Sequence, residues 1–538
     1  MTAFHSRRSD PQAMSRAQGA DSGCSPAAQQ RNGGLQLQLV PEGSALMSGR
    51  LSSGPSRQVH EEILRPQFIF DMTHLLPHYL AVEVALLFEY ERMGVVTGDQ
   101  RRDITDILGR IDESTLSADP ATNMSDTSMA IEQWVHRQLT EPVPTWHVDR
   151  SRNDSQATAH ALAAREWFGG AAEDLLGLGE AVHRLANATT DMLMPGYTHL
   201  QAAQVITPGF YLAALSQQIL HNLRRWLATY DSNDLSPLGA GSMAGQQLPW
   251  DRHRMAHLLG FAGPVPHALT AVASRSLALE MMAEFSILGA ELSRFVTDLM
   301  TWGSNEYAFI DLPDELSGIS AAMPQKKNFP ILERIRGKLA HLGAFGVDIV
   351  LAQRSTPYSN MVEVSKEATA NLHVSVSTTR TALRLFSTVI DNLRFRSDRM
   401  REACRREYLG AFTLANDLTL NDGIPWRDAQ IVVGQYIAAA VSADIPPHPG
   451  DPGLLAEVAG RHGYQVSDAA RVLANAFDIE NAIRDKRSTG SVNPEALADL
   501  LASQADDFRL LRQQWDDRRE RRGSARALLG RQRRIGEE

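Results

Sequence analysis

The stretch SRSLALEMMAEFSILGAELSRFVTDLMTW, residues 274–302, decides the fold of this chain. Its apolar residues recur at three- and four-residue spacing over about eight helical turns. They occupy more than one face of the predicted helix. Because a helix that is apolar on several faces packs against neighbours on all of them, the stretch predicts an inner helix of a bundle.

Stretches with the same spacing lie on both sides of it. They run over residues 156–193, 209–232, 331–354 and 366–393. Several are longer than the usual globular helix, and strand patterns are scarce throughout the chain. We therefore expect an all-α fold built on a long central helical bundle, with oligomeric contacts on the outer apolar faces.

The 538 residues divide into four expected parts. Residues 1–58 are rich in Ser, Gly, Gln, Ala and Arg with little apolar periodicity, which predicts a disordered arm. Residues 59–155 are expected to form an N-terminal helical domain and residues 156–396 the central bundle. Residues 397–538 are expected to form a C-terminal helical domain with a charged tail. The mixed charges of that tail favour a solvated helix or frayed end over a nucleic-acid arm.

Composition excludes several classes of function. The net charge of −10 argues against a nucleic-acid partner, and the chain has no apolar run long enough to span a membrane. Two cysteines and no export signal indicate a reducing, cytoplasmic location. The histidines show no paired ligand spacing and no glycine-rich nucleotide loop is evident, so we expect neither a metal nor another cofactor.

Lysine is rare and clustered. Of the 53 basic residues only five are lysines, and four of these fall in two short segments, 317–338 and 357–367. Lysine is a compact point charge, whereas arginine is a planar fork. A chain that prefers arginine yet keeps lysine in these segments indicates that the choice of cation matters there.

Four polar segments interrupt the predicted helices. They are DRSRNDSQAT (149–158), PGYTHLQAAQ (195–204), SGISAAMPQKKNFPILERIRGK (317–338) and PYSNMVEVSKE (357–367). The first places donors at a helix start, which is a ready anion site. The second carries a loop histidine, which is usually structural unless it has partners. The third joins small, mobile residues to two lysines, with Pro330 suited to the first turn of the next helix.

In this order and spacing, the segments resemble the fumarase/aspartase superfamily and, within it, the argininosuccinate lyase branch. AAMPQKKN is similar to the mobile loop of that family. The blocks PLGAGSMAG (237–245), DTSMAIE (126–132) and GIPWRDAQIVVG (423–434) are similar to others. The resemblance covers roughly residues 126–434, far more than a single short motif.

The resemblance implies a three-domain fold, a homotetramer with a twenty-helix core, and active sites that take segments from three subunits. It also implies a small dicarboxylate substrate and β-elimination with release of fumarate. Ser320 would be the base, Lys326 would face the aci-carboxylate, and His199 would assist the leaving group and be oriented by Glu333. The residues expected to bind substrate are Ser151, Arg152, Asn153, Thr198, Asn328, Tyr358 and Lys366.

The departures from argininosuccinate lyases lie on the leaving-group side. Ser128 stands where those enzymes carry a histidine, and the stretch 79–88 is apolar except for Glu83. Glu363 replaces a glutamine. We therefore expect retained elimination with a smaller leaving group, first of all nitrosuccinate giving fumarate and nitrite for natural-product (antibiotic) biosynthesis. Argininosuccinate, another amine-releasing succinyl lyase and an inert structural homologue are the alternatives.

Overall fold

The computed structural model describes residues 53–532, of which residues 55–532 belong to one compact unit. The expected disordered arm, 1–58, therefore lies almost entirely outside the described residues. In the part that is described, helices dominate and strands are short, which confirms the all-α prediction. Within residues 53–532, none of the helices combines the length and the apolar character that a membrane crossing needs.

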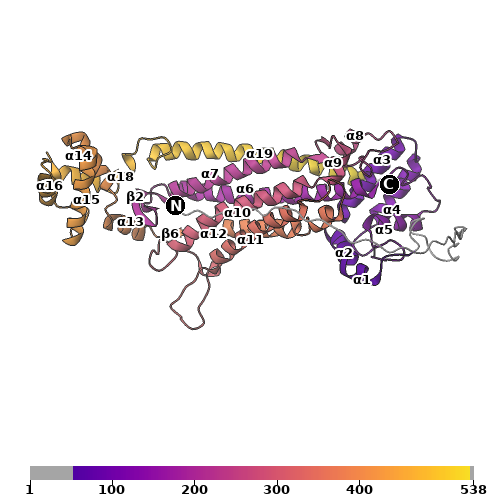
Figure 1. The fold of residues 1–538 in the computed structure, drawn as a ribbon, viewed down its shortest axis with the longest axis horizontal. Helices are drawn as coiled ribbons and strands as arrows, with labels where there is room; N and C mark the ends of the chain where they lie inside the picture. Colours follow the sequence, from indigo (N-terminus) through magenta and orange to yellow (C-terminus); the bar gives the residue numbers. More distant parts are fainter. Residues whose placement is uncertain (1–52, 533–538) are drawn as a thin grey trace, which may run out of the picture. The chain divides into compact units, whose positions relative to one another are not determined.

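Five long helices form the central bundle (Figure 1). They are α6 (Arg152–Ala188), α7 (Pro208–Ser232), α10 (Ser276–Trp302), α11 (Pro330–Gln353) and α12 (Leu372–Asn392). Helix α10 packs along α11, and α6 packs between α7 and α12. The rings of Phe168, Trp226 and Phe285 meet in the core with centroids 5.1–5.8 Å apart. The stretch that predicted an inner helix is therefore buried against several partners.

Two bundle helices begin several residues away from their predicted starts, whereas the other three begin within two residues of them. Helix α6 starts at Arg152 because the Ser151 hydroxyl caps it, accepting a hydrogen bond from the Asn153 amide at 3.1 Å. The stretch that begins at Lys366 instead opens with a π-helical turn, η3 (Glu363–Glu367), and α12 follows only from Leu372. The turn brings the Lys366 ammonium to 3.7 Å from the Asp71 carboxylate.

The N-terminal region has its own hydrophobic core, which Ala159 and Ala163 of α6 join. Its elements are α1 (Arg57–Val59), η1 (His60–Leu64), α2 (Arg65–His74), α3 (Leu76–Arg92), α4 (Gly98–Gly109) and α5 (Thr127–Gln138). Helices α8 (Arg252–Leu258) and α9 (Ala268–Ala273) belong to the segment between α7 and α10. Helix α8 packs against α3, and α9 packs against α6, so both flank the start of the bundle.

The C-terminal region forms a further core around Tyr436. Its helices are α13 (Ser397–Arg406), α14 (Ala411–Asp422), α15 (Trp426–Ser442), α16 (Pro452–Arg461), α17 (Ala469–Ala476) and α18 (Asn481–Arg484). The last helix, α19 (Pro494–Gln532), leaves this region and packs along α6 and α7 (yellow in Figure 1).

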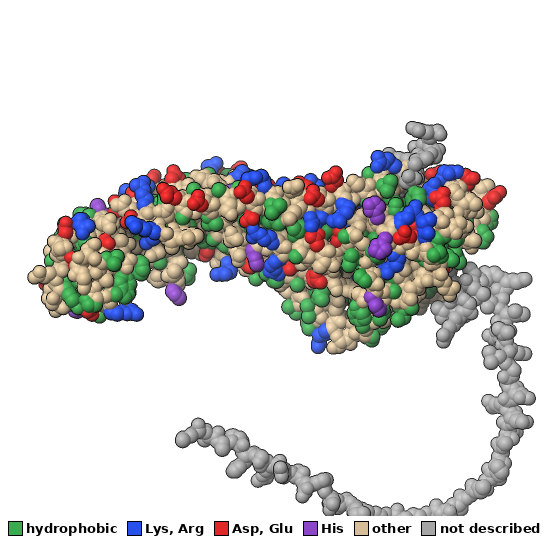
Figure 2. All heavy atoms as spheres, turned by 90° about the horizontal axis from the view of Figure 1, so that it is seen from above, with side chains coloured by type: hydrophobic (Ala, Val, Ile, Leu, Met, Phe, Trp, Pro, Cys, Tyr) green, Lys and Arg blue, Asp and Glu red, His purple; other side chains and the backbone are tan. Residues whose placement is uncertain are grey.

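The charged tail is not a wholly solvated helix, because α19 buries Phe508, Leu511 and Trp515 against the bundle. Its arginines pair with acids of the bundle, as Arg512 does with Glu173 and Glu180. Figure 2 shows basic and acidic side chains interspersed on the face that carries α19. This arrangement has no block of like charge that would favour nucleic acid.

The strands make three two-stranded sheets in the described residues. Strands β1 (Met194–Thr198) and β2 (Gln201–Ile206) form an antiparallel hairpin between α6 and α7. Strands β3 (Leu235–Ser236) and β4 (Gly263–Pro264) pair in parallel, and β5 (Ile310–Asp311) pairs antiparallel with β6 (Arg394–Phe395). A 3₁₀ turn, η2 (Asp314–Leu316), follows β5 and opens the loop that protrudes from the bundle before α11 (Figure 1).

Candidate active site

The first group of predicted site residues surrounds the start of α6. We call Ser151, Arg152, Asn153 and Lys366, with the Asp71 that Lys366 contacts, the α6-start cluster. Tyr358 is exposed, and no hydrogen bond between described residues joins it to them. The Arg152 guanidinium pairs with Asp126 at 3.1 Å, and the Asn153 amide donates to the Ser242 carbonyl at 3.1 Å. The Asp154 carboxylate accepts from the amides of Gly239 and Gly241, which holds the 237–245 block against the helix. The free amides of a helix start favour an anion here.

A buried pair of opposite charges belongs to this cluster. The Lys366 ammonium lies 3.7 Å from the Asp71 carboxylate. Thr127 Oγ1 donates a hydrogen bond of 3.1 Å to the same carboxylate. Tyr79 contacts the same Asp71 oxygen at 3.4 Å, whereas the other oxygen, Oδ1, is buried without a hydrogen-bond partner. Burial raises the pKa of Asp71 although the ammonium opposes this, and burial lowers the pKa of Lys366.

Glu83, the one acid of the apolar stretch 79–88, already forms an ion pair with Arg150. Both terminal nitrogens of the Arg150 guanidinium donate hydrogen bonds to the Glu83 carboxylate, and both side chains are almost fully buried. Such a two-point pair compensates the charge of Glu83, which makes it a poor partner for a ligand cation. Tyr358 and Glu363 are exposed instead. Asp71 therefore supplies the buried acidic oxygen without a partner among the described residues of the α6-start cluster.

The second group lies at the other end of α6. The β1–β2 hairpin turns at His199 and Leu200, both of which have left-handed backbone with φ of 54° and 60°. A two-residue hairpin turn of this hand usually needs Gly or Asn, so the backbone of the tip is strained. Thr198 and His199 are both exposed there. His199 lines a cavity of about 740 Å³ with Trp302 and Tyr307.

The loop before α11 lies at the same end of the bundle, where the Tyr307 ring meets the Tyr197 ring of the hairpin, but no hydrogen bond or ion pair between described residues joins the loop to the hairpin. The loop closes where Gly318 and Asn328 exchange backbone hydrogen bonds of 2.8 and 2.9 Å, so residues 319–327 project together. The Ser320 hydroxyl oxygen accepts from the Met323 amide at 3.2 Å. We call Thr198, His199, Ser320, Lys326, Asn328 and Glu333 the hairpin–loop cluster.

The two loop lysines differ in their surroundings. Lys327 is anchored, because its ammonium pairs with Asp311 and Asp314 at 3.2 and 3.1 Å and donates to the Leu312 carbonyl at 2.6 Å. Lys326 is exposed, and no acid among residues 53–532 pairs with it. Lys326 is thus the loop cation that is available to an anion.

One chain does not bring the two clusters together. Helix α6 has 37 residues, so Ser151 and the hairpin that follows its end are separated by ~55 Å. Helix α11 likewise separates the Ser320 loop from Tyr358 and Lys366 by ~36 Å over its 24 residues. Glu333 is exposed in the first turn of α11, and no hydrogen bond or ion pair between described residues joins it to His199. The expected pairing of Glu333 with His199 is absent within one chain.

Sequence reasoning missed Asp71 as a site residue. A signal was present, because FIFDMTHLL (68–76) places one acid in a mostly apolar stretch of helix, where an unpaired charge is costly if buried. Its partners Thr127 and Lys366 come from segments far apart in the chain. Together the two clusters provide cations, hydroxyls and a histidine for a dicarboxylate, and a buried acid for a cationic group.

Comparison with known proteins matches this chain to the Lyase family over residues 101–343. The chain is 30% identical to an argininosuccinate lyase of Chromohalobacter salexigens over 445 residues, which are 82% of this chain and 93% of that protein. It is 32% identical to an argininosuccinate lyase of Hahella chejuensis over 403 residues, 74% of this chain and 84% of that protein.

A solved structure has the same fold. A variant of EDDS lyase with bound fumarate superposes with a TM-score of 0.78 at 24% identity, covering 87% of this chain and 94% of that one. The match extends over the bundle and the regions at both of its ends.

Proposed function

Because this chain belongs to the argininosuccinate lyase branch of the fumarase/aspartase superfamily and is a fumarate-forming C–N lyase, we propose that its substrate is an N-substituted aspartate. Cleavage releases fumarate together with an amine, and argininosuccinate is the first candidate. The comparisons favour this amine-releasing reaction, an alternative at the sequence level, over the nitrosuccinate first expected.

The hairpin–loop cluster would act on the succinyl half of the substrate. Elimination removes a weakly acidic proton beside a carboxylate, so negative charge builds up on that carboxylate as an aci-anion. Ser320 is the proposed base, since an amide that donates to its oxygen stabilises negative charge there. The unpaired Lys326 ammonium and the Asn328 amide would stabilise the aci-anion. Thr198 would bind a carboxylate oxygen, and His199 would assist departure of the amine.

The buried Asp71–Lys366 pair is the observation that carries the proposal for the amine half. Asp71 keeps one buried oxygen without a partner, which suits an ammonium or guanidinium group, and Lys366 suits a carboxylate. An amino-acid leaving group carries both charges. A nitro group carries no separate cation, so nitrosuccinate would leave the Asp71 oxygen unpaired. Arg152, Asn153 and the start of α6 would bind the nearer carboxylate.

We propose a homotetramer whose sites combine the two clusters from different copies. If both clusters serve one site, the ~55 Å length of α6 forbids their meeting within one chain. The outer face of the bundle has the surface for association. Val347, Val350 and Leu351 form an i, i+3, i+4 stripe on α11 and are each at least half exposed. An apolar stripe of this kind on a bundle helix is typical of a subunit interface.

The proposal predicts that argininosuccinate is cleaved with a kcat/KM at least ~10-fold above that of nitrosuccinate, measured side by side as fumarate release. It also predicts that Asp71→Asn lowers kcat/KM for argininosuccinate by about 10²-fold, since losing one partner of a buried charge pair costs about 2–5 kcal/mol. Nitrosuccinate turnover by the same variant is the internal control and should change little. An equal loss for both substrates, or a wild-type preference for nitrosuccinate, would contradict the amine-releasing reaction.

A further inference from the structure

A cavity of about 300 Å³ lies beside α6, and neither proposed cluster contributes a side chain to it. Ala157, His160, Ala161, Ala164 and Trp167 of α6 line one wall at helical spacing. The other walls come from the segments 232–237 and 265–278, with Phe70, Thr369, Leu372 and His373. Ser232 and Ser276 on its rim are exposed, so the cavity is open to solvent there. Its volume is at the lower end of the range for small-molecule pockets.

Arg275 is the unusual residue in this lining. It is only 9% exposed, and no carboxylate in the described part of the chain pairs with its guanidinium. Nη1 donates to the carbonyls of Val272 and Ser274 at 2.9 and 2.7 Å, and Nη2 contacts Asn360 at 3.3 Å. Nε is buried and has no acceptor. A buried guanidinium that contacts only neutral groups has an uncompensated positive charge, which a bound anion would balance.

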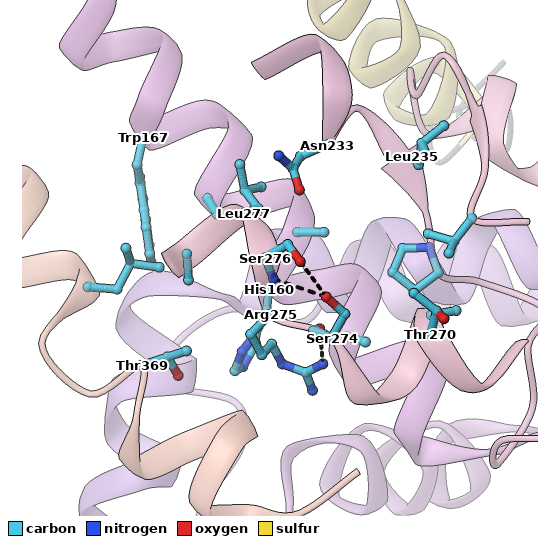
Figure 3. A pocket seen from close by; sticks show the side chains of 18 of the residues that line it. His160, Trp167, Asn233, Leu235, Thr270, Ser274, Arg275, Ser276, Leu277 and Thr369 are labelled. Carbon is cyan, nitrogen blue, oxygen red and sulfur yellow. Dashed lines mark hydrogen bonds between the residues drawn. The ribbon is translucent and has the colours of Figure 1, made fainter. Parts of the chain in front are cut away.

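The groups around Arg275 also favour an anion. Figure 3 shows His160, Ser274 and Ser276 close to Arg275. The Nε2 atom of His160 is buried without a partner, and burial lowers the pKa of this imidazole, so it is neutral and can donate to an oxygen. The ammonium of Lys366 is near enough to influence both His160 and Arg275. The hydroxyls of Ser274 and Ser276 are 2.7 Å apart.

The remaining walls favour an aromatic ring. Trp167 lies on one side of the cavity in Figure 3, with Leu235 and Thr270 on the other. The ring of His373 meets Trp167 edge to face at 5.1 Å and Phe70 at 6.2 Å, so three aromatic groups border the same space. Aromatic rings prefer such edge and offset contacts. A fully hydrated anion such as phosphate would leave these walls in contact with water.

We propose that this cavity binds a small aromatic carboxylate, with the carboxylate against Arg275 and His160 and the ring between Trp167 and Phe70. The inference goes beyond the lyase reaction and does not rest on it, because binding is measurable without turnover. The ligand is a separate carboxylate that binds beside the elimination site, because neither Asp71 nor Lys366, which are proposed to hold the departing amine, lines this cavity.

The test titrates phenylacetate into the full chain by calorimetry and compares it with phenylacetamide, its neutral isostere, and with acetate, which lacks the ring. Phenylacetate should bind at one saturable site per chain, at least ~10-fold tighter than either comparison ligand. Equal binding of phenylacetamide or acetate, or no saturation by phenylacetate at millimolar concentration, would overturn the proposal.

Variants locate the site. Ala161→Leu fills the cavity and should abolish phenylacetate binding, whereas Ala188→Leu, at the exposed end of the same helix, should leave it unchanged. Arg275→Gln should weaken binding at least ~10-fold. Because Arg275 also holds two backbone carbonyls, this variant could unfold, and Ala161→Leu then decides the matter. Wild-type affinity in a folded Ala161→Leu protein contradicts the assignment.

Steady-state kinetics checks that the cavity is distinct from the place of the departing amine. Phenylacetate should bind without competing with argininosuccinate. Competitive inhibition with a constant equal to the calorimetric Kd would contradict a separate ligand.

Discussion

Ser320→Ala is expected to lower kcat by about 10²–10⁴-fold, the range usual when a positioned proton-transfer group is removed. Affinity for fumarate should fall only modestly, since the hydroxyl takes part in proton removal more than in binding. The structural basis is the place of Ser320 in the projecting loop 319–327, where the Met323 amide donates to its oxygen. Single-turnover elimination by rapid mixing measures the chemical step directly.

Ser317→Ala is the matched control for that variant. The Ser317 hydroxyl donates back to the Pro313 carbonyl at 2.9 Å and so belongs to the base of the loop. Its loss should change kcat only a few-fold. Near-normal single turnover by Ser320→Ala, or an equal loss in Ser317→Ala, would remove Ser320 from the role of base.

Lys326→Arg should lower kcat/KM by about 10²–10³-fold, the usual effect of losing one preorganised charge at a developing anion. Arginine keeps the charge but replaces a compact ammonium with a planar fork, which does not fit a crowded carboxylate in the same way. The expectation is notable because this chain uses arginine for most of its other cations.

Lys327→Arg is the control for the lysine variant, since it makes the same change at the neighbouring residue. Lys327 pairs with Asp311, which Arg396 also contacts at 3.1 Å, so an arginine can take over this anchoring role. Its activity should stay within a few-fold of wild type. Equal tolerance at both positions would show that the rarity of lysine in this chain carries no chemical meaning.

The sequence predicted the bundle well because apolar periodicity is a local signal that long helices repeat many times. It could not predict that α19 returns to pack along α6 and α7, since a highly charged segment hides its buried apolar residues, among them Phe508, Leu511 and Trp515. The π-helical turn at Lys366 was missed for a similar reason. It brings Lys366 to Asp71, almost three hundred residues earlier in the chain, and no local pattern predicts such a tertiary contact.

The sequence predicted which residue types form the candidate site, but not which segments of the chain contact one another there. The segments around Asn153, His199 and Ser320 were identified by their motifs, yet no local pattern tells which segments meet. The apolar stretch 79–88 suggested a small leaving group, but Glu83 in it proves to be paired with Arg150, while Asp71 outside it keeps a free oxygen. Both facts depend on packing between segments.

In the proposed homotetramer, one site combines the α6-start cluster of one copy with the hairpin–loop cluster of another. Mixing variants tests this arrangement most directly. Asn153→Ala and His199→Asn, each inactive alone, are co-assembled at equal amounts, and fumarate release from argininosuccinate is measured. If the two residues of a site come from different chains, about a quarter of the sites in random mixtures contain both wild-type residues. Asn153→Ala mixed with Asn153→Asp is the control that cannot recover.

We therefore predict recovery to about a quarter of wild-type activity in the first mixture and none in the control. Oligomers that demonstrably contain both variants but gain no activity over the separate proteins would contradict the account.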